Sequence, residues 1–316
     1  MSEYDRLLDI APSWVRYLVL RDLLEVPVLE LAQSKKELLQ DPYVQTLLAS
    51  VANFHGPIVN THKNASLNIH HLLLLLSLDL GTEQPQIALA VQQILEHRDS
   101  FGVYQSRVLV SEKLGGSGQP GFGWALCDAP LLLLAINQAG LNTEEYVMPG
   151  VEYLSQLQFE LGFPCAVSKE LGTWRGPGKK LDPCPMATLW MLKLYASLPA
   201  FAGSKQAKSL MENLLSLWQN SLKQNPYMFF MGTDFRKLKA PLVWYDIVSV
   251  SDTFRQFAWL SGDPRFEEMK SIIHSKKGPD GLFTPESIYM VCKDQDFGQK
   301  KLPSAYLSFL CMRILK

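Results

Sequence analysis

The sequence lacks a strong net charge. Thirty basic and 31 acidic residues leave a formal net charge of −1 over 316 residues. A protein that binds nucleic acid or an anionic membrane through its overall field usually carries a clear excess of basic residues. We therefore expect no nucleic-acid partner, and any electrostatic recognition should be local.

The sequence also lacks the segments that direct export or membrane insertion. Its longest apolar run, from Leu72 to Leu80, is interrupted by Ser77 and Asp79 and is shorter than the roughly 20 residues of a spanning helix. No basic stretch followed by an apolar one opens the chain. The five cysteines are odd in number and form no CxxC pair, which favours free thiols in a reducing compartment. We expect a cytoplasmic protein without a transmembrane segment.

Apolar residues are abundant, at 47% of the chain, and two kinds of apolar segment alternate. One kind has helical spacing with polar residues between the apolar ones, which predicts helices with one buried face. The other kind is apolar on nearly every side, which is typical of fully buried helices. The amphipathic segments are 44–51, 147–157 and 211–222, and the buried ones are 71–80, 129–136, 186–194, 243–250 and 305–314.

The starts of the buried segments recur at a regular distance. Counting from Pro12 to Pro303, successive starts are separated by 55, 60, 55, 62 and 59 residues. Common open solenoids have shorter periods, about 33 to 47 residues. We predict an all-α fold, a single α/α toroid domain over residues 1–316 built from six helical hairpins with inner and outer helix rings. The expected starts are Pro12, Leu67, Cys127, Asp182, Trp244 and Pro303.

Turns that combine glycine with an aromatic residue occur where outer helices should end, at 99–102, 158–163 and 279–283. A glycine in the left-handed region can end a helix, and the aromatic side chain can then fix the turn to its neighbour. Together with the alternating helices, these turns resemble the terpenoid cyclase and protein prenyltransferase superfamily, which includes squalene-hopene cyclase-like proteins and prenyltransferase β subunits.

The most specific part of the resemblance is the stretch 175–190, RGPGKKLDPCPMATLW, which is similar to the Gly-Arg-Pro and Asp-x-Cys motifs of prenyltransferase β subunits. The resemblance implies that Asp182 and Cys184 bind a catalytic zinc ion, and we expect no other cofactor. The third family ligand is a histidine at the start of the last inner helix, where this sequence has LPSAYLS at 302–308. His70, His71 and Cys127 are candidate replacements. The Asp-x-Asp-Asp acid motif of the cyclases is absent from the sequence.

Polar side chains gather at the predicted inner starts and define a candidate site. The catalytic candidates are Asp128, Asp182, Tyr245 and Asp246, and the candidate ligand-binding residues are Trp14, His70, His71, Trp124, Trp174, Arg175, Lys179, Lys180 and Trp244. Structural alternatives stay open for several candidates: the aspartates Asp128 and Asp182 as helix N-caps, the cysteines as small core residues, the histidines as hydrogen-bonded core residues, and the lysines as solvated loop residues.

Three functions follow from these observations, and an enzyme and a non-catalytic protein are both open. The first is a prenyltransferase-like or cyclase-like protein that binds an isoprenoid or other apolar ligand in a central cavity, with a diphosphate head at the basic mouth. The second is a carbohydrate-active enzyme that uses two of the aspartates as acid and base. The third is a non-catalytic ligand-binding or interaction protein that lost the family motifs. Whether a protein partner is needed does not follow from the sequence.

Overall fold

The computed structural model describes residues 2–160, 162–174, 182–223 and 229–316. Contacts along the chain divide it into two compact units. The terminal unit contains residues 1–47, 64–66 and 231–316, and the middle unit contains residues 48–63 and 67–230.

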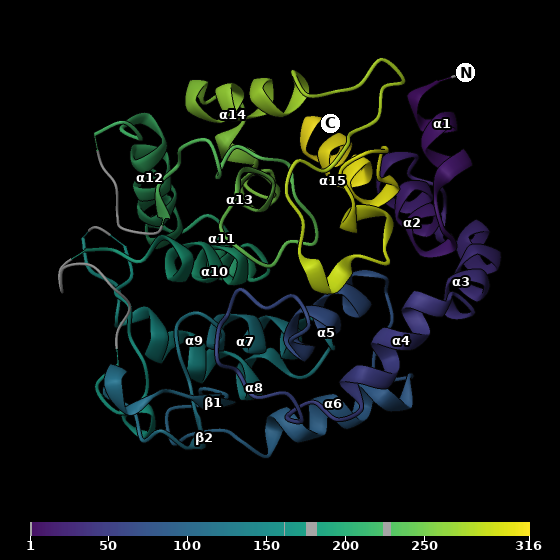
Figure 1. Cartoon of the computed structure of the whole chain (residues 1–316). Helices are drawn as coiled ribbons and strands as arrows, with labels where there is room; N and C mark the ends of the chain where they lie inside the picture. Colours follow the sequence, from purple (N-terminus) through teal and green to yellow (C-terminus); the bar gives the residue numbers. More distant parts are fainter. Residues whose placement is uncertain (1, 161, 175–181, 224–228) are drawn as a thin grey trace. The chain divides into compact units, whose positions relative to one another are not determined.

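The terminal unit brings the two ends of the chain together. The C-terminal helix α15 contacts α1, α2, α13 and α14, and α2 packs on α3. Its helices are α1 (Glu3–Ile10), α2 (Ser13–Leu18), the π-helix η1 (Val19–Leu23), η2 (Val28–Leu31), α3 (Ala32–Leu39), α13 (Ile247–Phe254), η6 (Ala258–Leu260), α14 (Pro264–His274), η7 (Met290–Cys292), η8 (Asp296–Gly298) and α15 (Ala305–Leu315) (Figure 1). Helix α4 (Pro42–Val51) leads from this unit into the next.

The middle unit is a stack of helices with a small hairpin. Helix α7 contacts both α5 and α10, and α10 also contacts α12. Its elements are α5 (Asn68–Ser77), α6 (Pro85–Leu95), β1 (Ser106–Leu109), η3 (Glu112–Leu114), β2 (Pro120–Gly123), α7 (Ala129–Gln138), α8 (Thr143–Tyr146), α9 (Met148–Ser155), η4 (Lys169–Leu171), α10 (Pro185–Ala196), α11 (Pro199–Ala202) and α12 (Lys205–Gln219) (Figure 1).

The mostly helical structure confirms the predicted all-α class, and the predicted helix starts agree closely with it. The six predicted starts correspond to α2, α5, α7, α10, α13 and α15, which begin at residues 13, 68, 129, 185, 247 and 305. Each start lies one to three residues after the predicted one. Proline occupies the first turn of α7 and α10, where its missing N–H group has no intrahelical partner. Nearly every residue of α10 is buried.

Two of the three glycine-aromatic turns, one in each unit, make equivalent hydrogen bonds to the buried helix that follows. In the middle unit, Phe163 donates its N–H to Thr188 Oγ1 at 3.2 Å and accepts from the Cys184 N–H at 2.7 Å. In the terminal unit, Phe283 donates its N–H to Ser308 Oγ at 2.8 Å and accepts from the Ser304 N–H. In both turns the hydrogen-bonded partners are separated by the same number of residues along the chain. The repeat seen in the sequence is therefore also a repeat of local structure.

The sequence did not predict the two-stranded antiparallel sheet of the middle unit. Strands β1 and β2 pair with Ser106 opposite Gly123 and Leu109 opposite Pro120. Strand β2 lies at the end of a glycine-rich stretch, and β1 precedes that stretch. Among the described helices, none is long and apolar enough to cross a membrane.

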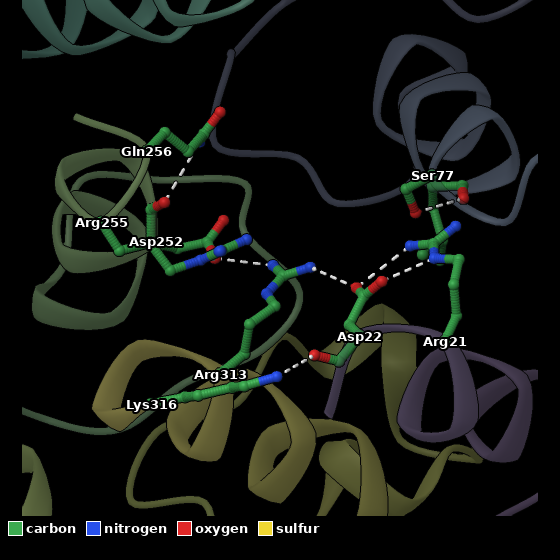
Figure 2. A network of polar contacts seen from close by, with 9 residues as sticks. Arg21, Asp22, Ser77, Asp252, Arg255, Gln256, Arg313 and Lys316 are labelled. Carbon is green, nitrogen blue, oxygen red and sulfur yellow. Dashed lines mark hydrogen bonds and ion pairs between the residues drawn. The ribbon is translucent and has the colours of Figure 1, made fainter. Parts of the chain in front are cut away.

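A network of charged side chains joins three elements of the terminal unit (Figure 2). Arg313 on α15 donates through Nη2 to Asp252 Oδ1 on α13 at 2.6 Å. Its other terminal nitrogen, Nη1, lies 3.5 Å from Asp22 Oδ2 on the π-helix η1. Arg255 Nε also donates to Asp252, at 2.8 Å. These contacts hold the first and last parts of the chain to α13.

Candidate functional site

The predicted site residues are divided between the two units. The terminal unit holds Trp14, Trp244, Tyr245 and Asp246, and the middle unit holds His70, His71, Trp124, Asp128, Trp174, Asp182 and Cys184. Arg175, Lys179 and Lys180 lie outside the described residues. We describe each group within its own unit.

Asp246 is the most unusual acidic residue of the terminal unit. It is the N-cap residue of α13, where its Oδ1 accepts from the Ser249 N–H at 2.9 Å. Only 5% of the residue is exposed, and its other oxygen, Oδ2, is buried without a hydrogen-bond partner among the described residues. Burial raises the pKa of Asp246 to about 7, although the helix N–H groups and Lys239 oppose the shift. The carboxyl group is thus both a cap and a proton-exchanging group near neutral pH.

Tyr289 and Lys239 interact electrostatically with Asp246. Tyr289 is 9% exposed, and its hydroxyl is buried without a hydrogen-bond partner in the described part of the chain. Burial, with the nearby Asp246 carboxyl, raises the pKa of Tyr289. Lys239 Nζ lies 3.5 Å from the centroid of the Tyr289 ring, within the range of a cation–π contact. A carboxyl, a phenol and an ammonium group therefore share one electrostatic environment.

The position of Lys239 over Tyr289 results from pairing between two loops. Leu238 donates its N–H to Glu286 Oε2 at 2.8 Å and accepts from the Glu286 N–H at 2.9 Å. Lys276 forms an ion pair with the same Glu286 carboxylate. These contacts hold the loop before α13 and the loop before η7 side by side. Nothing in the sequence had indicated that Tyr289 belongs to the candidate site.

The terminal unit also contains two cysteines with raised pKa values and a cluster of aromatic side chains. Burial, and then the Asp246 carboxyl, raise the pKa of Cys311, while burial raises that of Cys292 to about 11. Both thiols are neutral at physiological pH. Cys292 also acts electrostatically on Tyr289 and on Tyr43. The candidate ligand-binding residue Trp14 lies in the same unit, with ring centroids 5.5 Å from Tyr43.

The rings around Trp14 are packed against one another. Its centroid lies 4.7 Å from that of Tyr306 and 6.5 Å from that of Phe297. Trp14 is 2% exposed, so in this structure its ring contacts are those of a core residue. The catalytic candidate Tyr245 is likewise buried, with its ring centroid 5.1 Å from that of Phe235. Trp244 is half-buried.

In the middle unit, Asp128 makes contacts that differ from those of a helix cap. It occupies the N-cap position of α7, but its side chain makes no capping hydrogen bond. Instead, Oδ1 accepts from the Ala125 N–H at 3.0 Å, and Oδ2 lies 3.3 Å from His62 Nε2. The alternative in which the Asp128 side chain caps α7 is therefore wrong. The carboxylate turns back toward the preceding loop because the Ala125 N–H and the imidazole lie there.

Asp182 and Cys184 were the predicted zinc ligands. Asp182 is half-buried and lies two residues before Cys184, the N-cap residue of α10, so the alternative in which Asp182 caps the helix is also wrong. Cys184 is buried, and a hydrogen bond with Cys127 raises its pKa to about 12, with burial adding to the shift and a hydrogen bond with Cys165 opposing it. The described residues include no group of three or more His, Cys, Asp or Glu side chains that could hold a metal ion. Zinc binding by Asp182 and Cys184 therefore stays a prediction.

Among the remaining middle-unit candidates, His71 and Trp124 have side-chain hydrogen-bond partners. Ser50 Oγ lies 2.8 Å from His71 Nδ1, and Trp124 Nε1 donates to Asp99 Oδ2 at 3.0 Å. Burial lowers the pKa of His70 to about 3, so its imidazole is neutral at physiological pH. Trp174 is half-buried.

Comparisons with known proteins give little further information. No protein-family model and no curated protein matches this sequence. The crystal structure of a protein from Actinoplanes aligns with a TM-score of 0.44 and 13% sequence identity over 96% of this chain and 88% of that one. This likeness is too low to assign a fold or an activity.

Proposed function

We propose that the terminal unit binds an isoprenoid or other apolar ligand and that Asp246 exchanges a proton with it. The observation that carries the proposal is the buried Oδ2 of Asp246, which has no hydrogen-bond partner among the described residues. A buried polar atom without a partner costs about 1–3 kcal/mol, and such atoms are often kept for binding or catalysis.

The neighbours of Asp246 suit an apolar substrate that becomes cationic or carries an anionic head. Aromatic faces stabilise positive charge, and Tyr289 is the aromatic residue whose pKa responds to Asp246. Lys239 acts electrostatically on the same carboxyl group and supplies a positive charge for a diphosphate. With a pKa of about 7, Asp246 can give a proton to a substrate carbon or oxygen and take one back at neutral pH.

We further propose that the helices form the α/α toroid of the terpenoid cyclase and prenyltransferase superfamily. The support is the six-fold series of buried helices and the equivalent hydrogen bonds of Phe163 and Phe283 to the helices that follow them. Zinc bound by Asp182 and Cys184 stays a prediction, and no step proposed here uses it. Elemental mass spectrometry of the wild type beside Cys184→Ala tests it: loss of stoichiometric zinc in the variant would support the metal site.

The ligand proposal is tested by calorimetric titration with farnesyl diphosphate, with farnesol and inorganic diphosphate as probes of the tail and the head. We expect farnesyl diphosphate to bind more tightly than either part, and Lys239→Met to weaken binding of the diphosphate-bearing probes more than that of farnesol. No binding of farnesyl diphosphate or farnesol would overturn the proposal and favour the carbohydrate alternative, which the same titration tests with a soluble oligosaccharide.

The proton-transfer proposal needs a separate readout. Product analysis of the wild type with farnesyl diphosphate should show turnover that falls by about 100-fold or more in Asp246→Asn, with ligand affinity largely kept. Asp9→Asn, a change of an exposed aspartate in the same unit, is the matched control. Binding without any turnover in the wild type would instead indicate a non-catalytic ligand-binding protein.

A further inference from the structure

The chain segment that ends at Lys239 is bound to the start of α13. The Ile247 N–H donates to the Phe235 carbonyl at 2.9 Å. Ile247 is the first residue of α13 and directly follows the N-cap residue Asp246. Lys239 and Asp246 therefore lie on two segments that a main-chain hydrogen bond holds together.

The same segment is bound to the loop that carries Tyr289, and Glu286 makes these contacts. Its carboxylate accepts from the Leu238 N–H at 2.8 Å, and its own N–H donates to the Leu238 carbonyl at 2.9 Å. Lys276 forms an ion pair with the same carboxylate and donates to the Arg236 carbonyl at 2.6 Å. Glu286 thus contacts the segment directly at Leu238 and, through Lys276, at Arg236.

These contacts fix the main chain next to Lys239. Leu238 directly precedes Lys239, and Glu286 lies three residues before Tyr289. The two short connections bring Lys239 Nζ to 3.5 Å from the centroid of the Tyr289 ring. A charged group that is already held in place binds its ligand with a smaller loss of side-chain freedom.

We propose that Glu286 is a positioning residue for head-group recognition: by fixing Leu238, it holds the Lys239 ammonium group where the diphosphate head binds. The inference rests on the function proposed above for the terminal unit. Glu286 itself contacts no ligand and acts through Lys239. Its role is to favour a ligand with a diphosphate head over the same ligand with a neutral head.

The titration of Asp246 reports the position of Lys239 without any ligand. The positive charge of Lys239 lowers the pKa of Asp246, against the effect of burial, and the negative charge of Asp234 raises it. If the ammonium group moves away, the pKa of Asp246 should therefore rise. Removal of the negative charge of Glu286 has, by itself, the opposite effect on a nearby carboxyl group. The sign of the change separates loss of position from loss of charge.

The first test follows Asp246 by NMR in the full-length protein labelled with ¹³C-carboxyl aspartate, and Asp246→Asn identifies its signal. Glu286→Ala should raise the pKa of Asp246, as Lys239→Met does, and should cause no further rise in the Lys239→Met background. Glu286→Gln keeps a hydrogen-bond acceptor and should not raise the pKa. Glu267→Ala removes another ion pair between an exposed acid and a lysine of the same unit and should change nothing.

The second test is calorimetric titration with farnesyl diphosphate and farnesol. Glu286→Ala should weaken binding of farnesyl diphosphate by about tenfold, as expected for the loss of one hydrogen bond to a charged group, with little effect on farnesol. If the wild type binds neither probe, the proposed function fails and the head-group role fails with it. The titration of Asp246 then still shows whether Glu286 positions Lys239.

Several results would overturn the proposal. These are a pKa of Asp246 that is unchanged or lowered in Glu286→Ala, no rise in Lys239→Met, an equal rise on adding Glu286→Ala to Lys239→Met, or equal losses of affinity for the two probes.

The Glu286 variants should fold, because the Glu286 side chain is 41% exposed and its truncation leaves no buried cavity. Circular dichroism of each variant checks the fold before titration. If Glu286→Ala does not fold, Glu286→Asp takes its place, since it keeps the charge on a shorter side chain and should also raise the pKa of Asp246.

Discussion

Arg313 Nη2 donates to Asp252 Oδ1 at 2.6 Å, and this contact links the last helix of the chain to α13 (Figure 2). Both side chains are largely buried, with exposed fractions of 14% and 6%. Asp22 lies further from Arg313, at 3.5 Å, so Asp252 is the main partner of the guanidinium group.

We therefore expect Asp252→Ala to lower the free energy of unfolding by about 3 kcal/mol, the magnitude typical of breaking a buried ion pair. Urea unfolding followed by circular dichroism measures the change. Asp234→Ala is the control, because it breaks the Lys237–Asp234 pair in which the Asp234 side chain is 90% exposed. That pair should contribute at most about 1 kcal/mol. Equal losses in the two variants would contradict this assignment.

Gly150→Ala should destabilise the protein although alanine is the better helix former. Gly150 lies in α9, and a Cβ there would meet the Gly102 carbonyl oxygen at 2.6 Å and Leu133 Cδ2 at 2.9 Å. Alanine normally stabilises a helix interior by up to about 1 kcal/mol, whereas overpacking costs about 1–3 kcal/mol. We expect a net loss in thermal unfolding temperature. At Gly203 a Cβ meets nothing within 4 Å, so Gly203→Ala should change the temperature little.

Helix order and burial could be predicted from the sequence because they depend on local periodicity. The all-round apolar character of 186–194 was enough to predict the buried helix α10. The glycine turns were predictable for the same reason: Gly102, Gly162 and Gly281 all have positive φ angles, which glycine adopts without strain.

The contacts of the candidate sites could not be predicted, because they depend on pairings between distant segments. Tyr289 belongs to no motif and approaches Lys239 only through the hydrogen bonds between Leu238 and Glu286. Asp128 precedes a proline-containing first turn, as a cap would, yet its side chain bonds to Ala125 and contacts His62. Residue type alone does not decide between these two arrangements.

Asp128 offers a test of this unexpected arrangement. Asp128→Ala leaves the buried Ala125 N–H without its acceptor, which should lower the free energy of unfolding by about 1–3 kcal/mol. Asp128→Asn retains an oxygen at the same position and should cost clearly less. Urea unfolding of the two variants beside the wild type makes the comparison. If both variants lose the same stability, the Ala125 contact is not the reason for the acid at this position.

Asp246 should leave its own signature in the pH dependence of stability. Burial raises the pKa of the folded Asp246 carboxyl from 3.8 to about 7. Between these values the folded chain binds more protons at this site than the unfolded chain, so the free energy of unfolding falls as the pH rises. The full slope for one such group is about 1.4 kcal/mol per pH unit. The stabilising effect of the protonated acid is complete below about pH 4 and lost above about pH 7.

Asp246→Asn isolates this effect, because asparagine can still accept from the Ser249 N–H but does not ionise. Urea unfolding at intervals from pH 4 to pH 8 should show the variant gaining stability relative to the wild type up to about pH 7, after which the difference becomes constant. All other groups titrate in both proteins and cancel in the difference. Asp9→Asn, at an exposed position, should give a difference that does not vary over this range. A flat difference for Asp246→Asn would show that the Asp246 carboxylate is already ionised at low pH, and Asp246 could then not act as the proton donor.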